Sequence, residues 1–73
     1  MHTIQVYLDE SLPVKKLAEV KAAILSMPFV ENVVINENDN HDLMVDYDEH
    51  HGMPMDILDT ISSKGLHPDI ISG

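Results

Sequence analysis

Hydrophobic and polar residues alternate over residues 3–8, and Leu43, Val45 and Tyr47 alternate with Met44, Asp46 and Asp48. Residues 30–35 are rich in β-branched residues, and Val33 and Ile35 would share one face of a strand there. A period of two is typical of a β-strand that buries one face and exposes the other. We therefore expect three strands with one apolar side each. The side chains predicted to be buried on them are Ile4, Val6, Leu8, Val33, Ile35, Leu43, Val45 and Tyr47.

A helical period follows the first of these strands. Ser11 is expected to cap the helix, and Pro13 to lie in its first turn, where the missing N–H of proline costs nothing. Pro28 should end the helix, because proline disfavours a helical conformation at the residue before it. The predicted apolar stripe of this helix consists of Leu17, Val20, Ile24 and Met27.

A second helix is predicted to begin near Pro54, and Gly65 is placed to end it in a left-handed conformation. The segment 66–71 then reads as a last strand, and Pro68 within it marks this strand as an edge of the sheet. The predicted apolar stripe of the second helix consists of Met55, Leu58 and Ile61, with Ile57 at its border.

The segment 37–40 (Glu-Asn-Asp-Asn) is rich in turn formers and closes a hairpin between the second and third strands. The order of elements is therefore β-α-β-β-α-β. With short connections and right-handed crossovers, this order predicts an α+β, ferredoxin-like sandwich. In this fold two helices cover one face of a four-stranded antiparallel sheet. With 73 residues, the chain is expected to form one domain, residues 1–73.

The charge balance limits the partners. The chain has 13 acidic residues against 4 lysines and no arginine, which gives a net charge of −9. This charge argues against nucleic acid and against an anionic membrane surface, and it is compatible with cations and basic protein surfaces. The first ten residues lack the cationic start and long apolar run of a signal peptide, so a cytoplasmic location is expected.

The spacing of the core positions resembles that of the heavy-metal-associated domain, the fold of copper chaperones and of the N-terminal modules of metal-pumping ATPases. The resemblance covers nearly the whole chain. It implies the sandwich fold described above and a role in metal handling or in docking to partner proteins. The matching positions are Val20, Ile24, Met27 and Val30, then Val33-x-Ile35 and Val45-x-Tyr47-Asp48, and finally Ile57, Ile61 and Lys64-Gly65-Leu66.

The diagnostic motif of that family, Met-x-Cys-x-x-Cys at the start of the first helix, is missing because the chain has no cysteine. Counting back from Val20 places the two cysteine positions at Pro13 and Lys16, and the methionine position at Ser11. Counting forward from the first strand aligns Leu8 with the methionine instead, so the loop is expected to be longer here. Capture of Cu(I) or Zn(II) on thiolates is therefore not predicted.

Two other groups of residues suggest metal chemistry. A site for copper, nickel or zinc is predicted from His2, His50, His51 and Met53, which the topology places at the end of the sandwich opposite the family's metal loop. The alternative is that Met53 packs before the helix and the histidines are solvated. At the loop end, a carboxylate–histidine site for Mn(II) or Ni(II) is a second hypothesis, with ordinary acidic turns as its alternative. Its residues are Asp9, Glu10, Glu37, Asp39, His41 and His67.

No nucleophile–base–orienter set can be assembled from the serines, threonine and histidines, so an enzyme is not predicted. The first functional hypothesis is a non-catalytic module that binds a protein partner without a cofactor, with Lys15, Lys16 and Lys64 as the docking residues. The second is a metal-handling domain that uses His, Met and carboxylate ligands. The third is a small-molecule sensor of the ACT type, although the first loop lacks the glycine that such domains commonly have.

Overall fold

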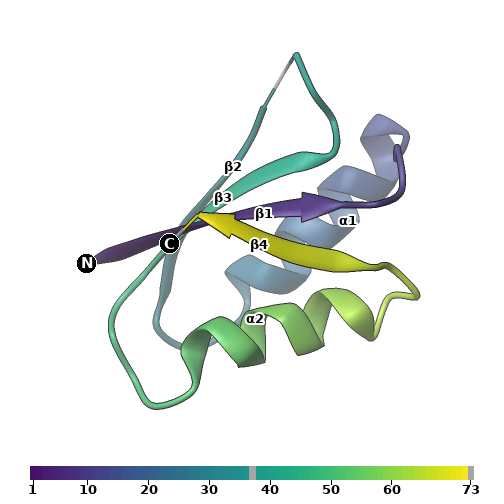
Figure 1. Ribbon diagram of the computed structural model, residues 1–73. Coiled ribbons are helices and arrows are strands. Elements are labelled where there is room, and N and C mark those ends of the chain that lie inside the picture. The colour runs from purple at the N-terminus through teal and green to yellow at the C-terminus, as the bar shows by residue number, and fades with distance from the viewer. Residues whose placement is uncertain (37, 73) are drawn as a thin grey trace.

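The computed structural model describes residues 1–36 and 38–72. The chain runs through six elements in the predicted β-α-β-β-α-β order (Figure 1). The bounds of these elements are β1 (His2–Leu8), α1 (Val14–Leu25), β2 (Val30–Ile35), β3 (Asp42–Tyr47), α2 (Met53–Ser62) and β4 (Pro68–Ser72).

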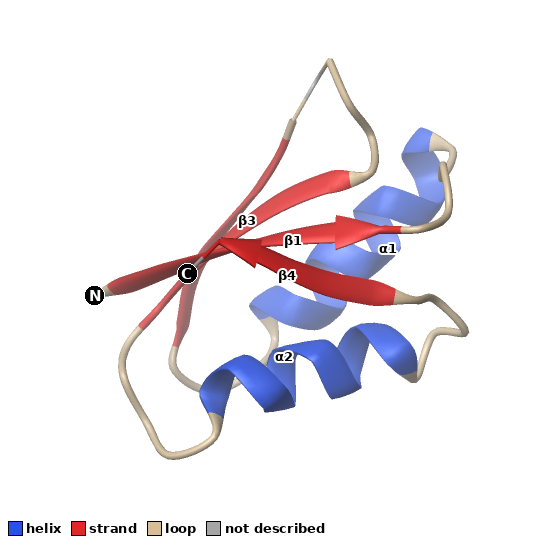
Figure 2. Cartoon of the chain, in the orientation of Figure 1, coloured by secondary structure: helices blue, strands red, loops and turns tan. Residues whose placement is uncertain are grey.

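The four strands form one antiparallel sheet in the order β2-β3-β1-β4, so β2 and β4 are its edges. Both helices lie on the same face of this sheet (Figure 2). The other face is open to solvent. The predicted ferredoxin-like sandwich is therefore confirmed, as is the prediction that the last strand is an edge.

The core lies between the helices and the covered face of the sheet. Every strand residue predicted to be buried is buried except Ile35, which is half-buried and packs against the core. In the described part of the chain, the buried set contains no charged residue. The core residues are Ile4, Val6, Leu8, Leu12, Leu17, Val20, Ile24, Val33, Leu43, Val45, Tyr47, Met53, Ile57, Ile61 and Leu66.

Both ends of α1 differ from the prediction. The N-cap is Pro13, not Ser11, and no side chain caps the helix. Ser11 lies too early in a loop that is held in place by the burial of Leu12. The helix ends at Leu25, so Met27 lies beyond it, half-buried against the core. The following turn carries Phe29 in a left-handed conformation, with φ of 71°.

The buried stripe of α2 also differs from the prediction. It consists of Met53, Ile57 and Ile61, while Met55 is 62% exposed and Leu58 is half-buried. The helix begins at Met53, and burial of this residue rotates the residues four and eight positions later into the core. The helix ends at Ser62, and Gly65 adopts the expected left-handed conformation two residues after the C-cap, with φ of 80°.

The predicted hairpin between β2 and β3 is present, although Glu37 lies outside the described residues. Side chains close the turn: Oδ1 of Asn36 accepts from the N–H of Asn38 at 2.9 Å, and Oδ1 of Asp39 accepts from the N–H of His41 at 3.0 Å. In the described ranges, no helix has the length and apolar character needed to cross a membrane.

Candidate functional site

Three loops meet at the end of the sandwich where the family resemblance predicts metal ligands. They are the β1–α1 loop, the β2–β3 hairpin and the α2–β4 loop. The side-chain amide of Asn40 donates to the carbonyl of Leu12 at 2.8 Å, and the hydroxyl of Ser11 donates to Oδ1 of Asn40 at 3.0 Å. The β1–α1 loop is thereby fixed to the hairpin, and buried Leu12 anchors it to the core.

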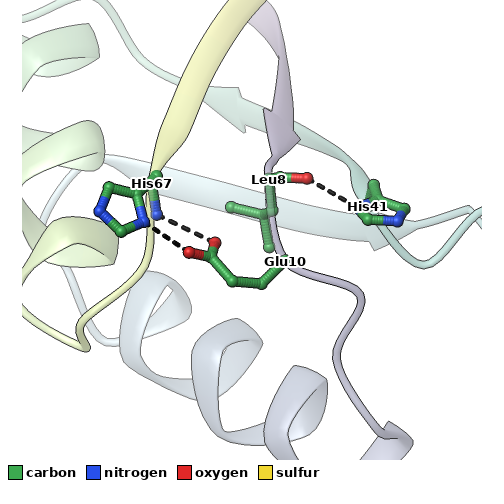
Figure 3. Close-up of polar contacts among 4 residues, drawn as sticks. All are labelled: Leu8, Glu10, His41 and His67. Atoms are coloured by element: carbon green, nitrogen blue, oxygen red, sulfur yellow. Dashed lines mark hydrogen bonds and ion pairs between the residues drawn. The ribbon is translucent and has the colours of Figure 1, made fainter.

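Glu10 and His67 join the β1–α1 loop to the α2–β4 loop (Figure 3). Nδ1 of His67 lies 2.5 Å from Oε2 of Glu10, and the backbone N–H of His67 donates to Oε1 at 3.1 Å. The side-chain hydrogen bond raises the pKa of His67 and lowers the pKa of Glu10, because it stabilises the charged form of each. The pair is thus a charge-assisted link between two loops.

His41 is held separately from that pair (Figure 3). Its Nδ1 lies 2.7 Å from the carbonyl oxygen of Leu8, and its ring stacks on Tyr7 with ring centroids 5.1 Å apart. Because a carbonyl can only accept, Nδ1 of His41 carries the proton in this contact.

The carboxylate–histidine hypothesis required these two histidines to converge with Asp9 and Asp39. In residues 1–36 and 38–72, no group of three or more histidine, aspartate or glutamate side chains is arranged to hold a metal ion. Glu37, also part of that hypothesis, lies outside the described residues. Glu10 instead pairs with His67, while Asp39 and His41 bind backbone groups.

The two positions aligned with the family's cysteines do not fit a soft metal. Pro13 is the N-cap of α1 and has no donor atom in its side chain. Lys16 is an ammonium, and its Nζ lies 3.7 Å from Oε2 of Glu19 on the next turn. Neither residue can supply the sulfur that Cu(I) prefers.

At the opposite end, the residues of the predicted His–Met site have separate surroundings. His2 stacks on Tyr47, and its Nε2 lies 3.2 Å from Oε2 of Glu49. His50 stacks on Phe29, with ring centroids 4.2 Å apart. His51 is exposed.

Met53 is 2% exposed and packs in the core, so its sulfur is not available at the surface. The buried side chain matches the packing alternative for this residue. Among the described residues, His2, His50 and His51 do not form a group that could hold a metal ion. A site formed by them therefore stays a prediction that requires these side chains to move.

The lysines predicted to dock a partner lie at the loop end. Lys15 and Lys64 are exposed, and Lys16 is partly covered and paired with Glu19. Lys15 and Lys16 are in the first turn of α1, and Lys64 follows the C-terminus of α2. Because α1 follows β1 and α2 follows the antiparallel strand β3, these two helix ends share one end of the sandwich. Their role in docking stays a prediction.

A groove of about 710 Å³ between α1 and the edge strand β2 was not predicted. The one feature of the sequence that could have indicated this groove is the run of β-branched residues at 33–35. These residues lie in β2, which is an edge strand of the sheet. The lining residues are Val14, Leu17, Ala18, Lys21, Asn32, Val33, Val34, Ile35, Asn36 and Asn40.

No family model and no curated protein matches this chain. Solved structures, by contrast, match it over nearly its whole length. The copper-binding domain from HMA7, a P-type ATPase, superposes with a TM-score of 0.81 at 20% identity, covering 99% of this chain and 96% of that one. The N-terminal domain of PacS from Synechocystis PCC6803 gives 0.81 at 21% identity, covering 99% and 100%.

Oxidized MerP from Ralstonia metallidurans CH34 has a TM-score of 0.84 at 14% identity and covers 97% of each chain. Identities this low establish the shared fold. The chain therefore has the fold of the heavy-metal-associated domains, as its sequence predicted, and it has this fold without a cysteine.

Proposed function

We propose that this chain is a non-catalytic binding module that acts through contacts with other proteins and carries no metal on thiolates. The observation that supports it is the way the β1–α1 loop is held. Asn40 binds the carbonyl of Leu12, Glu10 binds His67, and the two cysteine-equivalent positions are Pro13 and Lys16. A loop held by its neighbours needs no metal to order it.

The charge of the chain supports a protein partner over a nucleic acid or an anionic membrane. A net charge of −9 repels phosphate groups and is compatible with a protein surface as partner. Lys15, Lys16 and Lys64 form one candidate docking face within this proposal.

A metal-handling role is the second candidate. It is supported by the shared fold, since one of the matching structures is a copper-binding domain. It is also supported by the positions of two imidazoles at one end of the sandwich. His2 stacks on Tyr47, and His50 stacks on Phe29. Phe29 precedes Val30, which pairs with Tyr47 in the sheet. In this version His2, His50 and His51 would bind copper, nickel or zinc without Met53.

Amide-resolved NMR titrations with Cu(I), Cu(II), Ni(II) and Zn(II) separate the two candidates. The proposal expects no stoichiometric, saturable shifts at low-micromolar metal. Saturable shifts confined to His2, His50 and His51 would overturn it in favour of the second candidate. A variant with alanine at these three positions is the matched control, because it should remove any such shifts and keep the fold.

A further inference from the structure

The groove between α1 and β2 combines an apolar wall with a free sheet edge. Its wall is a stripe of α1 in which Val14, Ala18 and Lys21 recur at intervals of one helical turn, with Leu17 between them. Val14 is 83% exposed and Ala18 is exposed, although both are apolar. These apolar side chains of α1 are therefore exposed in the groove, where a further strand could cover them.

The main-chain groups along the other side of the groove are oriented for strand pairing. The N–H of Asn36 donates to the carbonyl of Asp42 on β3 at 3.1 Å. In an antiparallel ladder, hydrogen-bonded pairs alternate with non-bonded ones, so Val34 also faces β3. The N–H and C=O groups of Val33 and Ile35 therefore point away from β3, toward the free edge of the sheet.

Sheet edges are usually protected, and β2 is protected over one half. Its first half carries the charge of Glu31 and a register shift between Val30 and Asn32. A charge and a bulge are devices that discourage pairing with another strand. The second half, Val33-Val34-Ile35, has neither, and together with Asn32 it lines the groove. The other edge strand, β4, begins with Pro68.

We propose, building on the protein-binding function above, that this groove accepts an extended segment of a partner protein, which pairs with β2 as a fifth strand. Such a strand lies about 4.8 Å from β2, beneath the α1 stripe. Its alternate side chains cover Val14 and Ala18, so they are apolar. Main-chain pairing supplies affinity, and the alternate side chains supply selectivity.

Lys21 determines the charge of the segment. It lines the groove, and among the described residues it takes part in none of the ion pairs. An acidic side chain in the partner strand places a carboxylate beside this ammonium. A second copy of the chain is a poorer occupant, because each copy carries a net charge of −9 and the two repel each other.

The probe is a phage library of random nine-residue peptides, selected on the folded chain. We expect enriched peptides in which apolar residues occupy alternate positions and one residue is acidic. Binding of a synthetic copy should weaken at least tenfold in Ala18→Asp, which puts a carboxylate in the groove. The matched control is Ala22→Asp, the same change at an exposed position of α1 outside the groove, which should bind as the unchanged chain does.

Charge reversal tests the role of Lys21. Lys21→Glu should weaken the peptide at least tenfold, and exchange of the peptide's acidic residue for lysine should restore binding. The comparison variant is Lys15→Glu, the same change on the same helix at a residue of the candidate docking face outside the groove, which tests that face against the groove. If Lys15→Glu weakens binding and Lys21→Glu does not, the docking face is the lysine cluster, and the groove proposal is wrong while the protein-binding function stands.

N-methylated peptides test strand pairing directly. Methylation of the alternate amides that face β2 should abolish binding, and methylation of the intervening amides should not. Equal effects of the two series, or a library that yields no peptide dependent on Ala18, would overturn the proposal. Concentration-dependent dimerisation lost in Ala18→Asp, measured by sedimentation, would identify a second copy as the occupant and overturn it as well. The metal titrations test the underlying function independently.

Discussion

Nδ1 of His67 and Oε2 of Glu10 lie 2.5 Å apart and join two loops that are 57 residues apart in sequence. The backbone N–H of His67 donates to the other oxygen of the same carboxylate. Glu10 is therefore bound by two donors of one residue. This contact fixes the β1–α1 loop to the α2–β4 loop, whereas Asn40 fixes it to the β2–β3 hairpin.

The contact between Glu10 and His67 should stabilise the folded chain most within a limited pH range. The pKa of His67 is raised above 6.5, so its contribution is complete below pH 6.5 and is lost as the pH rises through the pKa of the folded state. The pKa of Glu10 is lowered below 4.5, so its contribution is complete above pH 4.5 and is lost as the pH falls through the folded value. Both are complete together between pH 4.5 and 6.5. Within that window Glu10→Gln should destabilise the chain most.

An NMR titration of the His67 ring checks this directly. The pKa of His67 should fall toward its ordinary value in Glu10→Gln, because the carboxylate that favours the imidazolium is gone. Added salt should reduce the difference, since the side chain of His67 is 74% exposed. Glu19→Gln is the control and should leave the pKa of His67 unchanged. An identical pKa in the unchanged chain and in Glu10→Gln would contradict the contact.

The register of α2 predicts a large loss of stability on truncating Ile57 and almost none on truncating Met55. Ile57→Ala should lower the free energy of unfolding by about 2–5 kcal/mol, because Ile57 is fully buried and its loss leaves a cavity. Met55→Ala should change it by less than about 0.5 kcal/mol, because Met55 is 62% exposed. Urea denaturation at neutral pH measures both. A larger loss in Met55→Ala would restore the stripe expected from the sequence.

The strands could be predicted from sequence because their signal is local. The alternation over residues 3–8 assigns a face to each side chain, and Ile4, Val6 and Leu8 are buried as it indicated. The helix stripe was ambiguous because apolar residues at 53, 55, 57, 58 and 61 fit two rotations of a short helix. The burial of Met53, which decides between them, depends on tertiary packing.

The site could be predicted only in part, because its contacts are not local. The topology correctly brought the β1–α1 loop, the hairpin and the α2–β4 loop to one end. It did not indicate that Glu10 would pair with His67 or that Asn40 would bind the carbonyl of Leu12. A single apolar residue in a polar loop, such as Leu12, has no period to reveal its burial. The groove likewise follows from the order of strands, which leaves β2 uncovered.

Replacement of Gly65 should lower the stability of the chain only through its backbone conformation. Its φ is 80°, and among the described residues nothing lies within 4 Å of the place that a Cβ would occupy. Gly65→Ala should therefore destabilise the chain by about 1–2 kcal/mol through the left-handed backbone alone. Gly65→Asn should cost less, because asparagine tolerates this conformation. Thermal unfolding of the two variants checks the order, and equal losses would point to a steric cause instead.

Alanine variants of Asn40 and Ser11 distinguish residues that hold the β1–α1 loop from a residue that caps α1. Asn40→Ala removes the donor to the part-buried carbonyl of Leu12 and should cost about 1 kcal/mol. Ser11→Ala should change the free energy of unfolding by less than about 0.5 kcal/mol, because Ser11 is exposed and does not cap α1. A loss of about 1 kcal/mol in Ser11→Ala that persists in Asn40→Ala, where the Ser11–Asn40 hydrogen bond is already absent, is what an N-cap would give, and it would contradict the position of the helix start. Asn38→Ala, the same change at an exposed position of the hairpin, is the control for Asn40→Ala and should leave stability nearly unchanged.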